Sequence, residues 1–215
     1  MQRLRIRFRR GQEVKFISHL DIIRLWHRAL NRAGISLAYS EGFNPHPRIS
    51  LAAPLAVGVT SEAELMDIVL TKPASPHFFT AAISQQLPPG IEILQVHPIA
   101  LTIPSLQSQV SYAEYEVKLE AEKERKDVAS AITSLLSLKC LPWQHQRDTG
   151  LRKYDLRALI DDLWLIDWHN GQGTIGMRLR CDGSGSGRPE QVTAALGFTQ
   201  YPQSLHRTKL VFKTI

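Results

Sequence analysis

Apolar and polar residues alternate without a break over residues 3–9, the first patterned stretch of the chain. A period of two is typical of a β-strand that buries one face. Leu4, Ile6 and Phe8 share the apolar face. The opposite face consists of Arg3, Arg5, Arg7 and Arg9. Arginines are costly to bury without partners, so this face is either solvated or available to bind an anionic surface such as nucleic acid.

The apolar spacing then changes, which predicts a helix from residue 19 to residue 33. Ile22 and Trp26 recur at helical spacing, and Ser18 followed by Asp21 is a capping pattern for the first turn. Gly34 is a typical residue just beyond a helix end. A separate stripe at intervals of four consists of Arg24, Arg28 and Arg32. This stripe is either a solvated helix face or a second set of phosphate contacts.

The next segment predicts a rigid loop, because it contains two prolines, a glycine and an asparagine. The loop consists of residues 39–48 and includes Gly42, Phe43, Asn44, Pro45, His46, Pro47 and Arg48. Strands are expected at 49–59, 64–70 and 91–96, with a helix at 73–87. The order in this half is therefore strand, helix, strand, strand, helix, strand, as in the split βαβ arrangement of ferredoxin-like folds.

A polar stretch at 101–109 predicts a linker, after which a similar plan begins again. Strands are expected at 112–119, 154–159, 163–168, 174–180 and 208–213, and helices at 122–138 and 189–196. The predicted fold class is α+β, with two ferredoxin-like (βαββαβ) halves, 1–100 and 110–215, and antiparallel sheets. No residue-level repeat links the halves, so the second half is predicted from its element order alone.

Composition narrows the function classes. The chain of 215 residues has a net charge of +6 and a pI near 9.5, which favours nucleic acid, an acidic protein face or phosphorylated ligands. No apolar run reaches the roughly 18 residues that span a bilayer, and the N-terminus does not read as a signal peptide. The two cysteines, Cys140 and Cys181, form no framework of the secreted kind. We therefore expect a cytoplasmic protein without a membrane partner.

Metal and cofactor chemistry is not indicated by the motifs. A radical S-adenosylmethionine (SAM) cluster needs three closely spaced cysteines, and the zinc motif Cys-x-x-Cys is also absent from the sequence. The histidines are scattered. We accordingly expect no metal site and no cofactor.

One glycine-serine loop is a candidate anion site. Gly183, Gly185 and Gly187 alternate with serines, and Arg188 follows before a predicted helix. Backbone N–H groups, a basic side chain and a helix N-terminus together bind anions in many proteins. The loop lacks the Lys-Ser/Thr ending of a P-loop, and the alternative is an ordinary flexible loop.

Two histidines are candidates for catalysis. His19 stands at the start of the arginine-striped helix, and His46 lies between two prolines beside Arg48. A histidine held near arginines can act as a general acid or base on a phosphodiester. The alternative is that each one packs or forms hydrogen bonds that hold its segment. The sequence contains no nucleophile motif and no paired-carboxylate motif.

Several segments resemble a known family. Phe16–Arg24, Leu37–Leu51 with its Gly-Phe-Asn-Pro-His-Pro run, and Pro54–Gly58 are closely similar to the radical-SAM-linked family of unknown function, DUF2344. Tyr154–Arg157 and Leu205–Leu210 are similar to its weaker, later motifs. Members of that family occur alone or joined behind a B12-binding radical SAM enzyme, so the resemblance implies such an enzyme as a partner.

The leading hypothesis is a non-catalytic accessory or substrate-binding module for a radical SAM enzyme, which contacts RNA through the two arginine sets. The 42–48 loop would then recognise the substrate, with Phe43 stacked on a base. One alternative is a metal-independent RNA-processing enzyme that uses His46 or His19. Another is a protein-docking scaffold with no RNA ligand.

Overall fold

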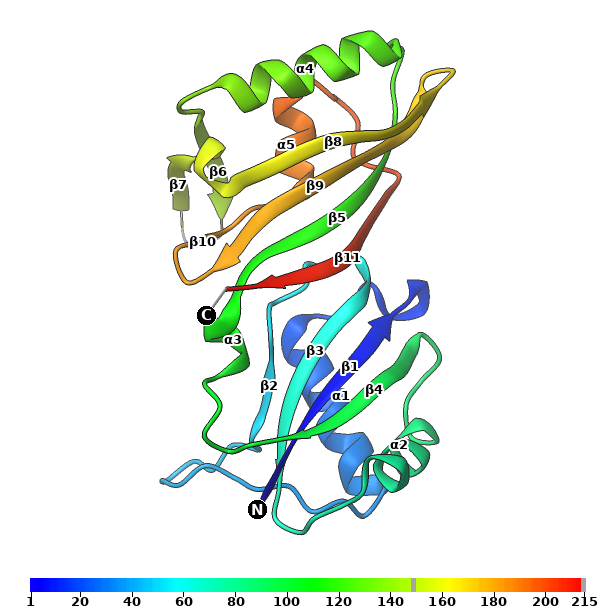
Figure 1. Cartoon of the computed structure of the whole chain (residues 1–215), viewed down its shortest axis with the longest axis vertical. Helices are drawn as coiled ribbons and strands as arrows, with labels where there is room; N and C mark the ends of the chain where they lie inside the picture. The colour runs from blue at the N-terminus through cyan, green and yellow to red at the C-terminus, as the bar shows by residue number, and fades with distance from the viewer. Residues whose placement is uncertain (148–149, 214–215) are drawn as a thin grey trace. The chain divides into compact units, whose positions relative to one another are not determined.

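The computed structural model describes residues 1–147 and 150–213. The chain divides into two compact units, Met1–Val110 and a second that begins at Ser111. Each unit has its own antiparallel strands and its own helices (Figure 1). The α+β class predicted from the sequence is confirmed.

The first unit alternates strands and helices in the predicted order. Its elements are β1 (Gln2–Arg10), α1 (His19–Arg32), β2 (Ile49–Leu51), β3 (Thr60–Leu70), α2 (Pro76–Ser84) and β4 (Ile91–Ile99). A short 3-10 turn, Gln12–Val14, precedes α1, and a short helix, α3 (Leu106–Gln109), follows β4. The strands lie in the order β2–β3–β1–β4, and each neighbouring pair is antiparallel.

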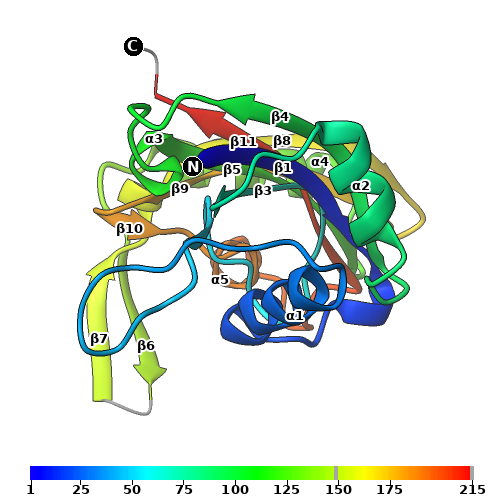
Figure 2. The ribbon, with the colours of Figure 1, turned by 90° about the horizontal axis from the view of Figure 1, so that it is seen from below.

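The alternation along β1 produces the buried face that the sequence predicts. Leu4, Ile6 and Phe8 are all 0% exposed and belong to one core with residues of α1 and α2. The Phe8 ring meets the edge of the Trp26 ring, with centroids 5.1 Å apart. Figure 2 shows α1 running across one side of this sheet. Full burial of side chains of this size contributes about 1.5–3 kcal/mol each, so this face holds α1 in place.

Both ends of α1 form as the sequence predicts. The Ser18 hydroxyl accepts a hydrogen bond from the Asp21 backbone N–H at 3.2 Å, which satisfies one of the unpaired N–H groups of the first turn. After the last turn, Gly34 has a φ of +69°, a conformation that glycine adopts without steric cost. The chain can therefore reverse direction immediately after the helix.

Two predictions for this unit need correction. The strand expected at 49–59 ends at Leu51, because Pro54 has no N–H to donate and Gly58 has a φ of +88°. The 101–109 stretch is not a simple linker, since it contains α3, and Leu106 is 0% exposed. This stretch therefore belongs to the first unit.

The second unit contains more elements than predicted. They are β5 (Val110–Glu120), α4 (Arg125–Ser137), β6 (Pro142–Arg147), β7 (Gly150–Asp155), β8 (Ile160–His169), β9 (Gln172–Asp182), β10 (Gly185–Ser186), α5 (Pro189–Ala195) and β11 (Ser204–Phe212). The main strands lie in the order β8–β9–β5–β11, while β6 and β7 form a separate two-stranded sheet. When β6, β7 and the short β10 are set aside, the strand order matches that of the first unit.

The β6–β7 hairpin is the main difference from the sequence prediction. A strand was expected at 154–159, but β7 ends at Asp155 and a 3-10 turn occupies Arg157–Leu159. The Asp155 carboxylate accepts from the N–H groups of Leu141 at 2.8 Å and Arg157 at 2.9 Å, which closes the base of the hairpin. The first of these hydrogen bonds is the main reason that the pKa of Asp155 is lowered.

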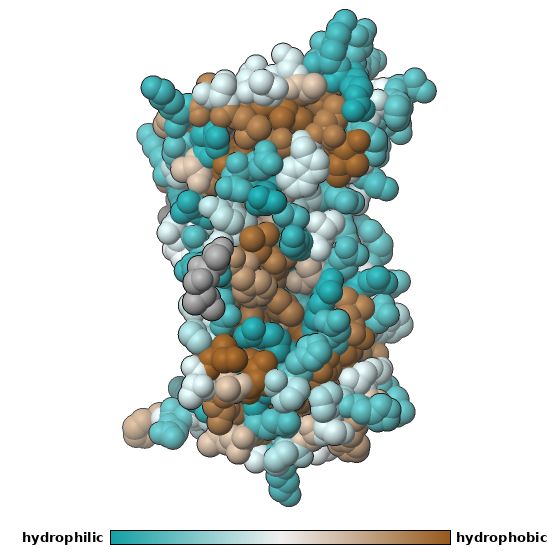
Figure 3. Space-filling model, viewed as in Figure 1, coloured by the Kyte–Doolittle hydropathy of each residue, from teal (hydrophilic) through white to brown (hydrophobic). Residues whose placement is uncertain are grey.

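No helix in the described ranges 1–147 and 150–213 is long and apolar enough to cross a membrane. Figure 3 shows one face of the molecule, on which apolar side chains gather over the strands and hydrophilic ones project around the margin.

Candidate functional site

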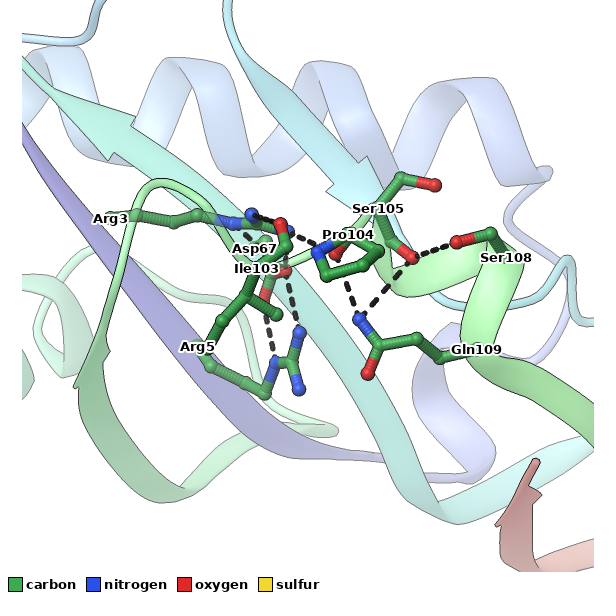
Figure 4. A network of polar contacts seen from close by, with 8 residues as sticks. All are labelled: Arg3, Arg5, Asp67, Ile103, Pro104, Ser105, Ser108 and Gln109. Atoms are coloured by element: carbon green, nitrogen blue, oxygen red, sulfur yellow. Dashed lines mark hydrogen bonds and ion pairs between the residues drawn. The ribbon is translucent and has the colours of Figure 1, made fainter. Parts of the chain in front are cut away.

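The β1 arginines do not form one uniform surface. Arg3 and Arg5 both bind the carboxylate of Asp67, which is only 2% exposed (Figure 4). Arg3 donates from Nη2 at 2.6 Å, and Arg5 donates from Nε at 2.8 Å. Asp67 stands directly opposite Arg5 in the β1–β3 register. Because one carboxylate holds two guanidinium groups, these arginines have a role inside the first unit.

Arg3 also joins the 101–109 stretch to the sheet. Its guanidinium donates to the carbonyl oxygens of Ile103 and Pro104. The Gln109 side chain donates to the same Pro104 carbonyl at 2.8 Å. The remaining strand arginines lie closer to water: Arg7 is exposed, and Arg9 forms an exposed ion pair with Glu92 at 3.1 Å. Of the strand set, Arg7 and Arg9 are therefore placed to meet a partner.

The stripe on α1 is exposed along its length, with Arg24, Arg28 and Arg32 all at the surface. Arg24 pairs with Asp21 at 2.9 Å, and both side chains are more than half exposed. Arg32 donates to the backbone carbonyl and the side-chain oxygen of Gln86, which fixes its guanidinium at the end of the helix. The three arginines thus form a continuous basic helix face.

A groove of about 400 Å³ runs beside this helix face. Its walls combine two guanidinium groups with apolar side chains: Leu25, Arg28, Arg32, Gln85, Gln86, Leu87 and Pro88. Such a lining suits a ligand that is anionic at one edge and apolar at another.

The predicted loop after α1 forms an irregular hairpin that extends away from the sheet (Figures 1 and 2). The Ser40 N–H donates to the His46 carbonyl at 2.9 Å, and the His46 N–H donates to the Ser40 hydroxyl at 3.0 Å. The Arg48 N–H donates to the Ala38 carbonyl at 2.8 Å. At the tip, Phe43 is fully exposed, with a relative exposure of 106%. The base of this hairpin is held by hydrogen bonds while an aromatic ring projects into solvent.

A histidine that the sequence reasoning missed connects the hairpin to α1. His27 Nε2 lies 2.9 Å from the Tyr39 hydroxyl and 3.3 Å from the Asn31 amide nitrogen. These two contacts form a short hydrogen-bond chain that links the start of the hairpin to α1. The four-residue spacing of His27 and Asn31 on one helix is the signal that was available in the sequence.

The two candidate catalytic histidines lie on different elements. His46 is exposed on the hairpin, and its backbone rather than its ring makes the contacts to Ser40. His19 is the first residue of α1 and is partly buried. A catalytic role for either histidine stays a prediction.

The glycine-serine loop is a tight hairpin rather than an open cradle. The Gly187 N–H donates to the Arg180 carbonyl at 2.9 Å, and the Ser184 N–H donates to the Asp182 carboxylate at 2.8 Å. A Cβ on Gly185 would lie 2.7 Å from Leu159, and one on Gly187 would lie 2.9 Å from Leu179. Close packing therefore favours glycine at 187, whereas at 185 the end of the Leu159 side chain can shift, and the backbone N–H groups of Gly187 and Ser184 are already engaged.

Potential metal ligands are scattered over residues 1–147 and 150–213. Within them, no three His, Cys, Asp or Glu side chains are grouped so that they could hold a metal ion.

The fold and this surface define an α+β protein that presents a basic helix beside an aromatic-tipped hairpin. We name this set of residues the α1–hairpin surface: Arg24, Arg28, Arg32, Phe43 and Arg48. The chain belongs to an uncharacterised protein family conserved in bacteria, DUF2344, which it matches over residues 3–189. No curated protein matches the chain in sequence.

Solved structures share the fold at low sequence identity. A Cbf5–Nop10–Gar1 complex contains a chain that matches with a TM-score of 0.52 and 10% identity, over 96% of this chain and 48% of that chain. An H/ACA RNP bound to a substrate RNA containing 2′-deoxyuridine matches with a TM-score of 0.50 and 9% identity, over 96% and 47%. This chain thus spans about half the length of those chains. At such identities the likeness concerns the fold alone.

Proposed function

We propose that this protein is a non-catalytic accessory module that contacts RNA through the α1–hairpin surface and works with a B12-binding radical SAM enzyme. We also assign both units to the ferredoxin-like type, because each has the order strand, helix, strand, strand, helix, strand once the β6–β7 hairpin and β10 are set aside. The single observation that carries the RNA role is the fully exposed ring of Phe43 on a hydrogen-bonded hairpin.

A fully exposed aromatic ring at the tip of a hairpin does not contribute to the hydrophobic core of its own unit. The hydrogen bonds between Ser40 and His46 already order the base of the hairpin. Little additional backbone entropy is therefore lost when a ligand binds to the ring at the tip. Stacking of a nucleobase on an aromatic side chain contributes about 1–3 kcal/mol and needs no particular base. Phe43 therefore fits a stacking contact with an unpaired nucleotide.

The exposed arginines complement such a contact. Successive turns of a helix are about 5.4 Å apart, so side chains four residues apart form a row along its axis. Arg24, Arg28 and Arg32 recur at about one helical turn, so a backbone that follows α1 can meet each guanidinium in turn. Arginine binds phosphate in a bidentate manner, which a lysine cannot do.

We test the RNA role with the double variant Arg24→Gln/Arg28→Gln in the full chain. Each lost phosphate contact should lower the slope of log affinity against log salt by about 0.7 for single-stranded RNA, so the slope should fall by about 1.4. Phe43→Ala should instead weaken binding about 5- to 100-fold without changing that slope, since stacking releases no counterions. Fluorescence anisotropy with single-stranded RNA over a salt series measures both quantities.

A matched control is Arg125→Gln/Lys126→Gln, which removes the same charge from exposed positions at the start of α4. This control should bind RNA like the unchanged protein. Equal losses in the α1 and α4 variants would show that only net charge matters, and unchanged binding in the Phe43 variant would remove the stacking contact from the proposal.

The partner enzyme rests on the family resemblance, and one further surface supports it. Phe16 and Leu20 are 73% and 62% exposed at the start of α1, and Val57 is 52% exposed in a loop joined to the same segment. That link is a hydrogen bond from the Gly58 N–H to the Lys15 carbonyl at 2.8 Å. Exposed apolar residues gathered in this way are typical of protein contacts.

The expected result for the partner role is co-purification with a co-expressed B12-binding radical SAM enzyme after nuclease treatment. Phe16→Ser/Leu20→Ser should lower the recovered enzyme at least tenfold, because two large apolar side chains no longer become buried in the contact. Phe78→Ser is the control, because it removes an exposed apolar side chain on α2, outside the proposed contact. Equal recovery in all three proteins would contradict the assignment of this surface.

A further inference from the structure

A small cavity in the second unit gathers basic side chains from three separate segments. Its lining includes His145 from β6, Arg152 from β7 and Arg188 from the residue that precedes α5. Tyr154, Leu159, Ser186 and Gln191 complete the lining. The sequence pointed to Arg188 alone, and the structure adds the two partners from a hairpin that the sequence did not predict.

The side chains around the cavity are held in place by one another. The Arg152 guanidinium lies over the Tyr154 ring, 5.6 Å from its centroid. The Tyr154 hydroxyl donates to the side-chain oxygen of Gln191, which is 7% exposed. A glutamine that accepts through its oxygen has its NH₂ group available as a donor. The cavity is thus bordered by ordered hydrogen-bond donors.

The acidic residue next to this cluster, Glu190, forms only a long ion pair with Arg188. Glu190 lies 3.9 Å from the Arg188 guanidinium, which is too long for a hydrogen bond. Arg188 is therefore able to reorient its N–H groups toward a ligand. Two arginines against the one carboxylate of Glu190 leave an excess of positive charge in this cluster, which an anion would neutralise.

The volume of the cavity restricts the kind of anion. It measures about 20 Å³, which is room for one water-sized group. A terminal phosphate can place one oxygen in the cavity and still offer two to the arginines, whereas a phosphodiester has only one non-bridging oxygen left for them. The lining offers the guanidinium groups of Arg152 and Arg188, the Gln191 amide and the exposed Ser186 hydroxyl as donors.

We propose that this cavity binds a terminal phosphate group through Arg152, Arg188 and His145, with the serine and glutamine side chains as further donors. The site is separate from the α1–hairpin surface and does not depend on the RNA role of the first unit. Free phosphate and the phosphate of a mononucleotide share the required chemistry, and the exposed Arg152 guanidinium offers a plane on which the base of a mononucleotide can stack.

The test uses the full chain and follows the ring signals of His145 by NMR during titration with inorganic phosphate and, in a parallel arm, with AMP. We expect saturable shifts, and we expect Arg188→Gln and Arg152→Gln each to raise Kd at least fivefold. Arg125→Gln is the control, because the 13-residue helix α4 separates it from the start of the β6–β7 hairpin by about 20 Å.

The outcomes separate the sources of the phosphate. Equal affinity for both ligands identifies free phosphate, and tighter binding of AMP identifies a nucleotide. Absence of saturable shifts with either ligand overturns the proposal, as does an equal loss of affinity in the Arg125 control. His145→Gln is a second variant, and it keeps a polar side chain of similar length. Its backbone amide signals along β7 show whether the hairpin is still folded.

Discussion

At the scale of single residues, Asp67 is the acceptor that holds the guanidinium groups of Arg3 and Arg5 in the first unit. Its carboxylate is 2% exposed and accepts hydrogen bonds from both Arg3 and Arg5. Through Arg3, the same cluster also reaches the carbonyl of Ile103. A buried carboxylate is tolerated here because two guanidinium groups neutralise it and occupy its oxygens.

We predict that Asp67→Asn lowers the free energy of unfolding by about 3 kcal/mol, because it leaves two guanidinium groups without their charge partner in a partly buried site. Amide hydrogen exchange along β1 in the full chain measures this loss.

The comparison variant is Arg9→Gln. Its ion pair with Glu92 is at least half exposed on both sides, so its loss should cost less than about 1 kcal/mol. If the two variants exchange at the same rate along β1, the Asp67 cluster has no special role in stability.

The sequence predicts the buried face of β1 but not the partners of the arginines on the other face. The alternation over 3–9 predicts which face of β1 is buried, because that pattern is local. The partner of Arg3 lies 64 residues away, and only the register between β1 and β3, which places Asp67 opposite Arg5, brings it within reach of both arginines. No local pattern carries a register, so the arginines of this face were all equivalent until the sheet was known.

At the scale of elements, the start of α1 couples helix stability to a titrating group. The Ser18 hydroxyl donates to the Asp21 carboxylate at 2.7 Å, and this hydrogen bond is the main cause of the lowered pKa of Asp21. Arg24 lowers the pKa further. A carboxyl whose pKa is lowered by folding stabilises the folded state above its unfolded value, and this contribution is lost as pH falls through the folded pKa.

We predict that Ser18→Ala raises the pKa of Asp21 toward its ordinary value, because the hydroxyl donor is gone while Arg24 remains. The same change should destabilise α1 by about 1 kcal/mol through loss of the cap. An NMR titration of the Asp21 carboxyl gives the pKa, and urea denaturation at pH 7 gives the stability.

The matched control is Ser75→Ala at the start of α2, where the hydroxyl also accepts from a backbone N–H, at 3.2 Å, but no acid occupies the first turn. It should lose a comparable cap and leave the pKa of Asp21 unchanged. A shift in that pKa on Ser75→Ala would show that the titration reports overall stability rather than the Ser18 contact.

The elements of the first unit were predictable because their signals are strong and local. Capping residues, helical spacing and glycine define α1, and alternation defines β1. The predicted strand at 49–59 was too long, because an apolar composition does not show where the pairing between strands ends. The β6–β7 hairpin was missed, since Pro142–Arg147 has no apolar alternation and its pairing with β7 is set by contacts rather than by composition.

At the scale of the whole chain, the net charge is more positive in the first unit than in the second, because the first unit has fewer acidic residues. Residues 1–110 contain 11 Lys and Arg against 7 Asp and Glu, a net charge of +4, while residues 111–215 contain 15 against 13, a net charge of +2. The pI therefore describes an average of two unlike surfaces. An anionic polymer would be attracted more strongly to the first unit, which also carries the α1–hairpin surface.

The strand order that both units share has a consequence for how the molecule arose. We propose a duplication followed by long divergence, because the two halves share one topology and show no residue-level repeat. In each half, the chain between the first helix and the second strand is enlarged: it forms the Phe43 hairpin in one and the β6–β7 hairpin in the other. The same connection has thus been elaborated twice, once around an aromatic tip and once around a basic cavity. In both halves the enlarged connection lies where it leaves the shared strand order undisturbed, so further insertions should be tolerated at this position.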